Sequence, residues 1–294
     1  MFGRFFGKRS ESKGSDFIIE DDEDIESDFI RDMKDNLIRL IAYAESADPT
    51  LQREVAERLA NEAVMPDRQV QIVESGGLQL LIPLTKSTDR EVRRLAAHAL
   101  ANLSVNAENQ ILMAENGAIE LLISLLDFNY ELAQRQAAKA LANLGVNSDN
   151  KRKIGKVGAI PKLVDLIASE VSVSVKIEVI AAMANLAVND ENEEEIIAAG
   201  ALLPLIANAQ MALDELLNSL YGSKSDDPHD NYMELAAQCA RCLRNLSVKP
   251  KNRSKIIDNG GLRELQRMSK MSCERVSSQA KRALKNIDPR KNKK

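Results

Sequence analysis

Apolar and small residues recur along the chain at helical spacing, in blocks that share one layout. Residues three or four apart lie on one face of an α-helix, and the block near residue 140 has this spacing at Ala133, Ala137, Ala140, Leu141 and Leu144. A shorter apolar run at 119–126 comes before this helix, and a short helical segment at 109–115 comes before that run. Each block therefore predicts three helices, a short one followed by two longer antiparallel ones.

A short phrase marks the third predicted helix of each block. Residues 99–103 read Ala-Leu-Ala-Asn-Leu, residues 140–144 repeat the phrase, and related copies occur elsewhere. The Asn of the phrase recurs after 41, 41, 42, 60 and 41 residues, at Asn61, Asn102, Asn143, Asn185, Asn245 and Asn286. A period near 41 residues indicates one supersecondary unit repeated along the chain.

A Gly-Gly or Gly-Ala pair precedes the second predicted helix in five blocks, beginning at Gly76, Gly117, Gly158, Gly200 and Gly260. Gly suits a sharp turn between helices because it accepts positive φ and leaves room for close approach. One block cannot bury its own apolar face, so neighbouring blocks must stack into a solenoid with a continuous core.

The Gly-Ala-Ile or Gly-Gly-Leu turn, followed by Ala-Leu-x-Asn-Leu-Ser, resembles the armadillo repeat, in register over about residues 29–288. Tetratricopeptide and ankyrin repeats are shorter, at about 33–34 residues, and propeller blades need alternating β-branched residues. HEAT repeats share the length but have two helices and usually lack the Gly-Ala turn. The resemblance implies an all-α, right-handed superhelical solenoid of about six repeats.

The repeat divides the chain into a central domain with two tails. We expect units at residues 29–66, 67–107, 108–148, 149–190, 191–250 and 251–288. The fifth unit has about nineteen extra residues, which predict a second helix reaching about Leu220 and a loop at 222–230. We expect residues 1–28 to form a disordered acidic tail and residues 289–294 a basic tail.

In armadillo folds the third helices line a concave groove, and the repeated Asn hydrogen-bonds the backbone of an extended ligand. The resemblance therefore implies peptide contacts for Asn102, Asn143, Asn185 and Asn245, with Asn61 and Asn286 in weaker terminal units. A carboxamide suits this role because it offers both a donor and an acceptor. The same Asn residues could instead cap turns or hydrogen-bond within their own repeat, and the sequence leaves both interpretations open.

Nuclear-import adaptors of this family carry Trp one turn before the Asn, and this chain has no Trp. The corresponding positions are His98, Lys139, Ala181, Arg241 and Arg282. The expected groove is basic toward its C-terminal end, with Arg241, Arg244, Lys249, Arg282 and Lys285. A basic groove favours an acidic peptide, as in the catenin-like branch. Solvated helix faces are the alternative interpretation of the same charges.

We therefore expect a scaffold or adaptor without enzymatic activity that binds an extended acidic peptide. Besides the four Asn residues, the expected peptide contacts are His98, Lys139, Arg241 and Arg244. The alternative function is a nuclear-transport adaptor that binds localisation signals. A catalytic or RNA-binding helical array is a third interpretation, and the scarcity of aromatic residues, at 3%, disfavours RNA.

Composition adds several expectations. The net charge of −4 provides no general attraction to nucleic acid. Three Cys residues imply no disulfide framework, which indicates a reducing compartment, cytoplasmic or nuclear. The pair Cys239 and Cys242 lacks enough further ligands for zinc, and neither His has a nucleophilic partner. We expect a monomer with no cofactor, metal or catalytic residue.

The N-terminal tail contains two patterns of interest. Residues 1–9 combine Phe with basic residues and could contact an anionic membrane surface. Residues 17–24 join an apolar triplet to an acidic run, which is similar to a SUMO-interacting motif and could also fold back on a basic groove as an autoinhibitor. A disordered acidic linker is the simpler interpretation.

Overall fold

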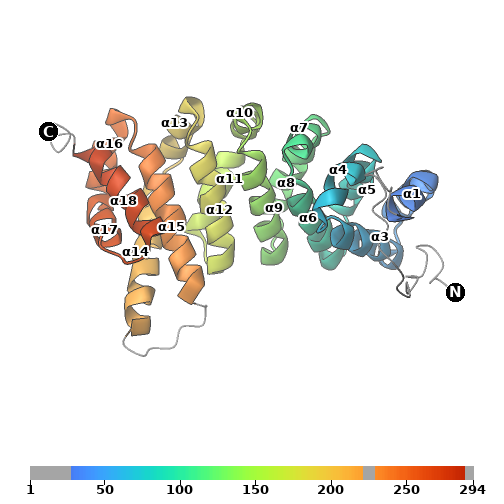
Figure 1. The fold of residues 1–294 in the computed structure, drawn as a ribbon, viewed down its shortest axis with the longest axis horizontal. Coiled ribbons are helices and arrows are strands. Elements are labelled where there is room, and N and C mark those ends of the chain that lie inside the picture. The colour runs from blue at the N-terminus through green and yellow to red at the C-terminus, as the bar shows by residue number, and fades with distance from the viewer. Residues whose placement is uncertain (1–27, 221–228, 289–294) are drawn as a thin grey trace, which may run out of the picture.

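The computed structural model describes residues 28–220 and 229–288, and within these ranges the chain forms α-helices and no strands. The helices follow one another in sets of three: α1 (Asp28–Asp35), α2 (Leu37–Ala44), α3 (Pro49–Glu62); α4 (Pro66–Glu74), α5 (Gly77–Leu84), α6 (Arg90–Leu103); α7 (Ala107–Glu115), α8 (Ala118–Leu126), α9 (Glu131–Leu144); α10 (Ser148–Lys156), α11 (Ala159–Ala168), α12 (Val173–Leu186); α13 (Asp190–Ala198), α14 (Leu202–Leu220), α15 (His229–Leu246); α16 (Pro250–Asp258), α17 (Gly261–Met268), α18 (Glu274–Ile287). The sets lie side by side in chain order (Figure 1), which confirms the predicted all-α solenoid.

The three helices of a set differ in length from the prediction. Outside the fifth set, the second helices have 8 to 10 residues and are about as short as the first helices. The third helices are long in every set, with 14 residues or more. The expectation of two long helices was wrong because the apolar run of the second helix ends after little more than two turns.

The turn between the first and second helices depends on Gly in five sets. Gly76, Gly117, Gly158, Gly200 and Gly260 have φ between 79° and 88°. This left-handed conformation is strained for residues with a Cβ atom. The predicted reason for the Gly positions is thus confirmed.

The third helices form one continuous row, α3, α6, α9, α12, α15 and α18, in which each helix packs on the next. Small residues make this close packing feasible, since Ala137 and Ala140 of α9 and Ala182 and Ala184 of α12 are fully buried. With the Leu, Ile and Val residues of the first and second helices, they form one core that runs the length of the described solenoid.

Buried asparagines join the first helices of successive sets. The Nδ2 atoms of Asn109, Asn150 and Asn192 donate to backbone carbonyl oxygens of the preceding first helix, on Gln69 at 2.8 Å, Gln110 at 2.7 Å and Lys151 at 2.8 Å respectively. In the last set, Asn252 donates to the carboxylate of Glu193. Each of these Asn residues lies seven positions after an Asn of the sequence phrase, so the repeat contains a second series of amides.

The fifth set is longer than the others. Its helices α14 and α15, of 19 and 18 residues, extend beyond the lower edge of the solenoid in Figure 1. Of the loop predicted at 222–230, only the last two residues are described, and they begin α15. Arg267 of α17 contacts Asp214 of α14 at 2.5 Å and joins the extension to the sixth set.

Two further predictions concern residues outside the described ranges. One is the expected disordered acidic tail, with its membrane-contacting and SUMO-interacting segments, and the other is the basic tail at 289–294. Of the expected acidic tail, only Asp28 is described, and it begins α1. Among the described residues, no single helix is long and apolar enough to cross a membrane. The helices α13 and α14 meet that criterion only as a pair bent by 83°.

Candidate functional site

The repeated asparagines lie on the third helices, and most of them bond to the preceding unit. The Nδ2 atoms of Asn185 and Asn245 donate to the carbonyl oxygens of Ala142 and Ala184, both at 2.7 Å. Asn143 makes a longer contact, 3.4 Å, to the carbonyl oxygen of Ala101, and a bond of 3.1 Å to Ser104 Oγ. Asn286 repeats this pattern on Arg244 O and Ser247 Oγ.

These bonds have a common physical role. The accepting carbonyl belongs to the residue just before the preceding Asn, within the last turn of a third helix. Carbonyl groups in the last turn of a helix have no partner within the helix. Each Asn therefore caps the C-terminal end of the third helix before it, which gives the amide a structural role between repeats.

The capping bond uses only part of each carboxamide. A primary amide has two N–H hydrogens and an acceptor oxygen, and the bond to the preceding helix takes one hydrogen. Asn143 and Asn185 are half-buried, so their amides reach the surface. The second N–H and the Oδ1 of Asn185 can pair with the C=O and N–H of an extended backbone. Asn143 Nδ2 already contacts Ala101 O and Ser104 Oγ, so this residue offers its Oδ1 to a backbone N–H.

Asn102 and Asn245 differ from the other two predicted contacts. Asn102 Nδ2 lies 3.3 Å from His98 Nε2 on the same helix. Burial, followed by the charges of Arg94 and Lys139, lowers the pKa of His98, so the ring is neutral at neutral pH and can accept this bond. The Oδ1 of Asn245 accepts from Arg244 Nε and Nη2, at 3.1 and 2.6 Å, so its acceptor is already in use.

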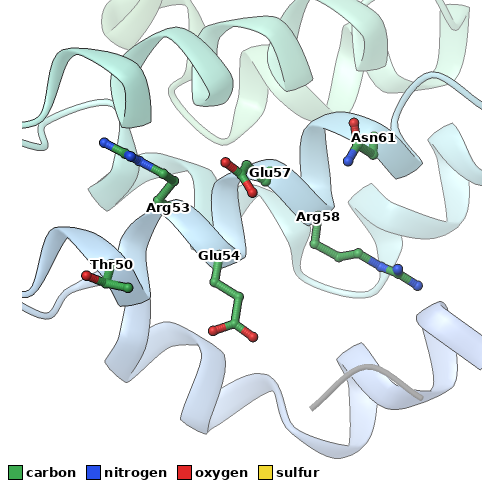
Figure 2. Close-up of a pocket in the computed structure, with 6 residues that line it drawn as sticks. All are labelled: Thr50, Arg53, Glu54, Glu57, Arg58 and Asn61. Carbon is green, nitrogen blue, oxygen red and sulfur yellow. The ribbon is translucent and has the colours of Figure 1, made fainter. Parts of the chain in front are cut away.

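We define the third-helix face as these Asn residues and the side chains one and two turns before them. At its N-terminal end, the face contains a hollow of about 370 Å³ beside α3, shown in Figure 2 and lined by Thr50, Arg53, Glu54, Glu57, Arg58 and Asn61. Arg53 pairs with Asp89 at 2.7 Å and Arg58 with Glu62 at 3.1 Å. Acidic and basic groups are thus balanced at this end.

The C-terminal end is basic. The pKa of Arg244 is lowered by burial and then by the charge of Arg282, which places the two cations close together. Arg282 is exposed, and Arg275 nearby pairs with Glu234 at 2.5 Å. Two neighbouring guanidinium groups repel each other, and an anion placed between them would stabilise both.

Arg241, another predicted contact, joins two units. Its Nη2 atom donates to the carbonyl oxygen of Ala181 at 3.0 Å. Burial lowers the pKa of this arginine, and its Nε atom is buried without a hydrogen-bond partner. The short side chain of Ala181, where other units have larger residues, lets the guanidinium cross to α12. Lys139 is half-buried on α9, at the corresponding position of its unit.

The sequence analysis missed Glu178, a half-buried acid between the two ends of the face. Burial raises its pKa, although Arg135 and Lys139 of α9 act in the opposite direction. Glu178 lies seven residues before Asn185, the same interval that separates Gln238 from Asn245. That interval is the signal that could have identified it.

Candidate chemistry elsewhere is limited in the part of the chain that the structure describes. No group of three or more His, Cys, Asp or Glu side chains there could hold a metal ion. Cys239 and Cys242 are fully buried, and burial raises the pKa of Cys242 to about 12. The Cys-x-x-Cys pair is therefore packed in the core as uncharged thiols.

Comparisons with known proteins agree with this architecture. The structure resembles an engineered protein of 30% identity, with a TM-score of 0.73 over 86% of this chain and 99% of the other. It also resembles a designed armadillo repeat protein (25% identity, TM-score 0.71, 85% and 99% of the two chains) and a designed armadillo repeat protein in complex with the peptide (KR)4 (26%, 0.69, 85% and 98%). No curated protein sequence matches. The family model described as Armadillo-like matches residues 32–221, and the chain belongs to that family.

Proposed function

We propose that this protein is a scaffold without enzymatic activity, which binds an extended segment of a partner protein across the third-helix face. The observation that carries the proposal is the series of amides on this face, of which Asn185 has used only one N–H hydrogen, in its bond to Ala142 O. A designed relative that forms a complex with the peptide (KR)4 supports peptide binding as a function of this architecture.

The spacing of the face suits an extended chain. Packed helices lie about 8–10 Å apart, and an extended strand rises about 3.3 Å per residue. One repeat therefore corresponds to about three residues of a bound peptide. Carboxamides that pair with the peptide backbone would hold its direction, and the side chains between them would determine which sequences bind.

We further propose that the bound segment is acidic where it crosses α15 and α18. The pKa of Arg244 is lowered by burial and then by the charge of Arg282, so the two cations are close enough to repel each other. A carboxylate between them would remove this repulsion and form charge-assisted hydrogen bonds. At the other end, Arg53 already has a carboxylate partner, so acidic residues have less to gain there.

Fluorescence anisotropy with a labelled peptide of alternating Glu and Ser tests both statements. We expect the Arg244→Gln/Arg282→Gln variant to bind at least tenfold more weakly, and the matched control Arg53→Gln to bind as the unmodified protein does. A second peptide, N-methylated along its backbone, keeps the same charges but loses its N–H donors. Equal affinity for both peptides would contradict backbone recognition, and unchanged affinity of the double variant would contradict the acidic segment.

A further inference from the structure

A row of exposed valines follows the ends of the third helices. Val64, Val105, Val146, Val188 and Val248 each lie three residues after a repeated Asn, and they are 54%, 59%, 64%, 62% and 58% exposed. Each stands in the turn that connects a third helix to the first helix of the next set. These turns follow one edge of the solenoid, the upper edge in Figure 1, near the labels α7, α10, α13 and α16.

The local structure gives no reason for apolar side chains at these positions. A residue just before a helix N-cap can pack on an apolar side chain four residues into the helix. For Val105, Val146 and Val188, that partner position holds Gln110, Lys151 and Glu193, which are polar or charged. All five valines are exposed, and Val105, Val146 and Val188 have no apolar partner at that helix position.

Acidic residues accompany the valines in the first four turns. Three positions after each valine stands an exposed carboxylate, in order Asp67, Glu108, Asp149 and Glu191. Asp149 is paired with Arg152 of its own helix, and both side chains are exposed. The fifth turn has Lys251 instead, and its Lys249 pairs with Asp190 at 2.8 Å. We call the four Val–carboxylate pairs the valine rim. A carboxylate in the first turn of a helix is also stabilised by the helix dipole. The dipole gives no reason for the exposed valine three residues before it.

A hollow of about 390 Å³ opens at the N-terminal end of the rim, between α1, α4 and α7. Asp67 and Glu108 of the rim line it together with Glu74, so three carboxylates face one cation, Lys34. The rest of the wall is Ile30, Val70 and Gln71. Ser75 also lines the hollow. Its side chain is 7% exposed, and its Oγ atom has no hydrogen-bond partner. The three carboxylates outnumber Lys34, so the hollow has a net negative lining, and its buried hydroxyl without a partner is suited to a further cationic donor.

We propose that the valine rim is a second docking surface, which binds a basic and apolar extended segment of a partner protein. Adjacent rim pairs lie one repeat apart, about 8–10 Å, so an extended segment presents one basic and one apolar residue to each pair about every three residues. Its first basic side chain enters the hollow, where the carboxylates bind the charge and Ser75 Oγ accepts a hydrogen bond. The proposal stands apart from the third-helix face and predicts a protein that can hold two partners.

The test uses a labelled peptide in which Lys-Leu-Ser is repeated four times, with a control peptide of equal composition in which the Lys and Leu residues are grouped separately. We expect the full-length protein to prefer the repeating peptide, and Val105→Ser/Val146→Ser to weaken its binding at least tenfold. Because these valines are exposed, their replacement leaves the fold intact, which circular dichroism verifies. Val248→Ser is the matched control, since its turn is basic, and should bind as the unmodified protein does.

Three results would overturn the proposal. The first is no binding of the repeating peptide at millimolar concentration. The second is binding that survives Val105→Ser/Val146→Ser but is lost on substitution of Asn143, which would assign the peptide to the third-helix face. The third is tighter binding after Arg4, Lys8 and Arg9 are replaced by Ser, which would show that the chain's own N-terminal segment, and not a partner, occupies the rim.

Discussion

Two single substitutions, Asn150→Ala and Asn185→Ala, test the two series of amides separately. Asn150 belongs to the buried series on the first helices, and Asn185 belongs to the series on the third helices. Both Nδ2 atoms donate to a backbone carbonyl of the preceding unit at 2.7 Å. Asn150 is buried, at 5% exposed, and its acceptor Gln110 is also buried. Asn185 is half-buried on the third-helix face. The two substitutions therefore remove bonds of equal length. The Asn150 bond is shielded from water, whereas the Asn185 bond lies close to solvent.

The expected effects follow from access to water. When Asn150 is replaced by Ala, no water molecule can take over the bond that Gln110 O accepted. The free energy of unfolding therefore falls by about 1–3 kcal/mol. Removing Asn185 opens Ala142 O to solvent, so a water molecule takes the bond and the cost is about 0.5–1.5 kcal/mol. A chain of this size has an m-value in urea of about 3 kcal/mol/M. The midpoint should fall by about 0.3–1 M for Asn150→Ala and by about half as much for Asn185→Ala.

Urea titrations followed by far-ultraviolet circular dichroism measure both midpoints. Because repeats unfold with nearest-neighbour cooperativity, the two variants, which lie in the same fourth unit, are compared with each other rather than with variants elsewhere. The reasoning is refuted if Asn185→Ala lowers the midpoint as much as Asn150→Ala does. That result would mean that the Asn185 amide is closed to solvent, and therefore closed to a peptide backbone.

Three further predictions concern single features of the fold. Gly158→Ala should lower the unfolding free energy by about 1–2 kcal/mol through its positive φ alone, since no atom lies within 4 Å of the added Cβ; Gly158→Asn should cost less in the same urea titration. Glu178→Gln should raise the melting temperature at pH 7. Burial raises the pKa of Glu178, so the folded state binds the proton more tightly and loses stability as pH rises above the ordinary carboxyl range; the gain should vanish below about pH 4, and a gain that persists there would contradict this cause. Iodoacetamide should label Cys273 in the folded protein but spare Cys239 and Cys242, which are buried, and mass spectrometry that finds either buried thiol labelled would oppose the packing described.

The sequence determines the solenoid because several independent signals recur at one period. The Gly before each second helix, the small residues of the third helix and the repeated Asn all return in register, and the structure has positive φ at Gly76 and its four counterparts. The expected length of the second helices was wrong although the sequence contained the signal. The apolar run at 119–126 ends at Leu126, where the structure also ends α8 after nine residues.

At the candidate site, the partners of the charged side chains were harder to predict than the positions of these residues along the helix. The sequence places Arg241 and Arg244 one turn apart on one helix, and periodicity alone treats them alike. In the structure, Arg241 crosses to Ala181 O, whereas Arg244 bonds its neighbour Asn245 and lies near Arg282. The difference arises because position 181, sixty residues earlier, is an Ala. Such a contact depends on the side chain of another unit, so it cannot be read from one repeat.

The amides on the third helices show why a sequence phrase could support two interpretations at once. One Asn position serves both roles. The carboxamide has the end of the previous helix on one side, where it caps a carbonyl group, and the open third-helix face on the other side, where it can bind a peptide. The bond from Asn185 to Ala142 O uses one N–H and holds the amide in place. A fixed amide loses less conformational entropy when it binds. The structural bond thus favours ligand binding, so a substitution such as Asn185→Ser, which shortens the donor, should weaken both stability and affinity for the Glu-Ser peptide.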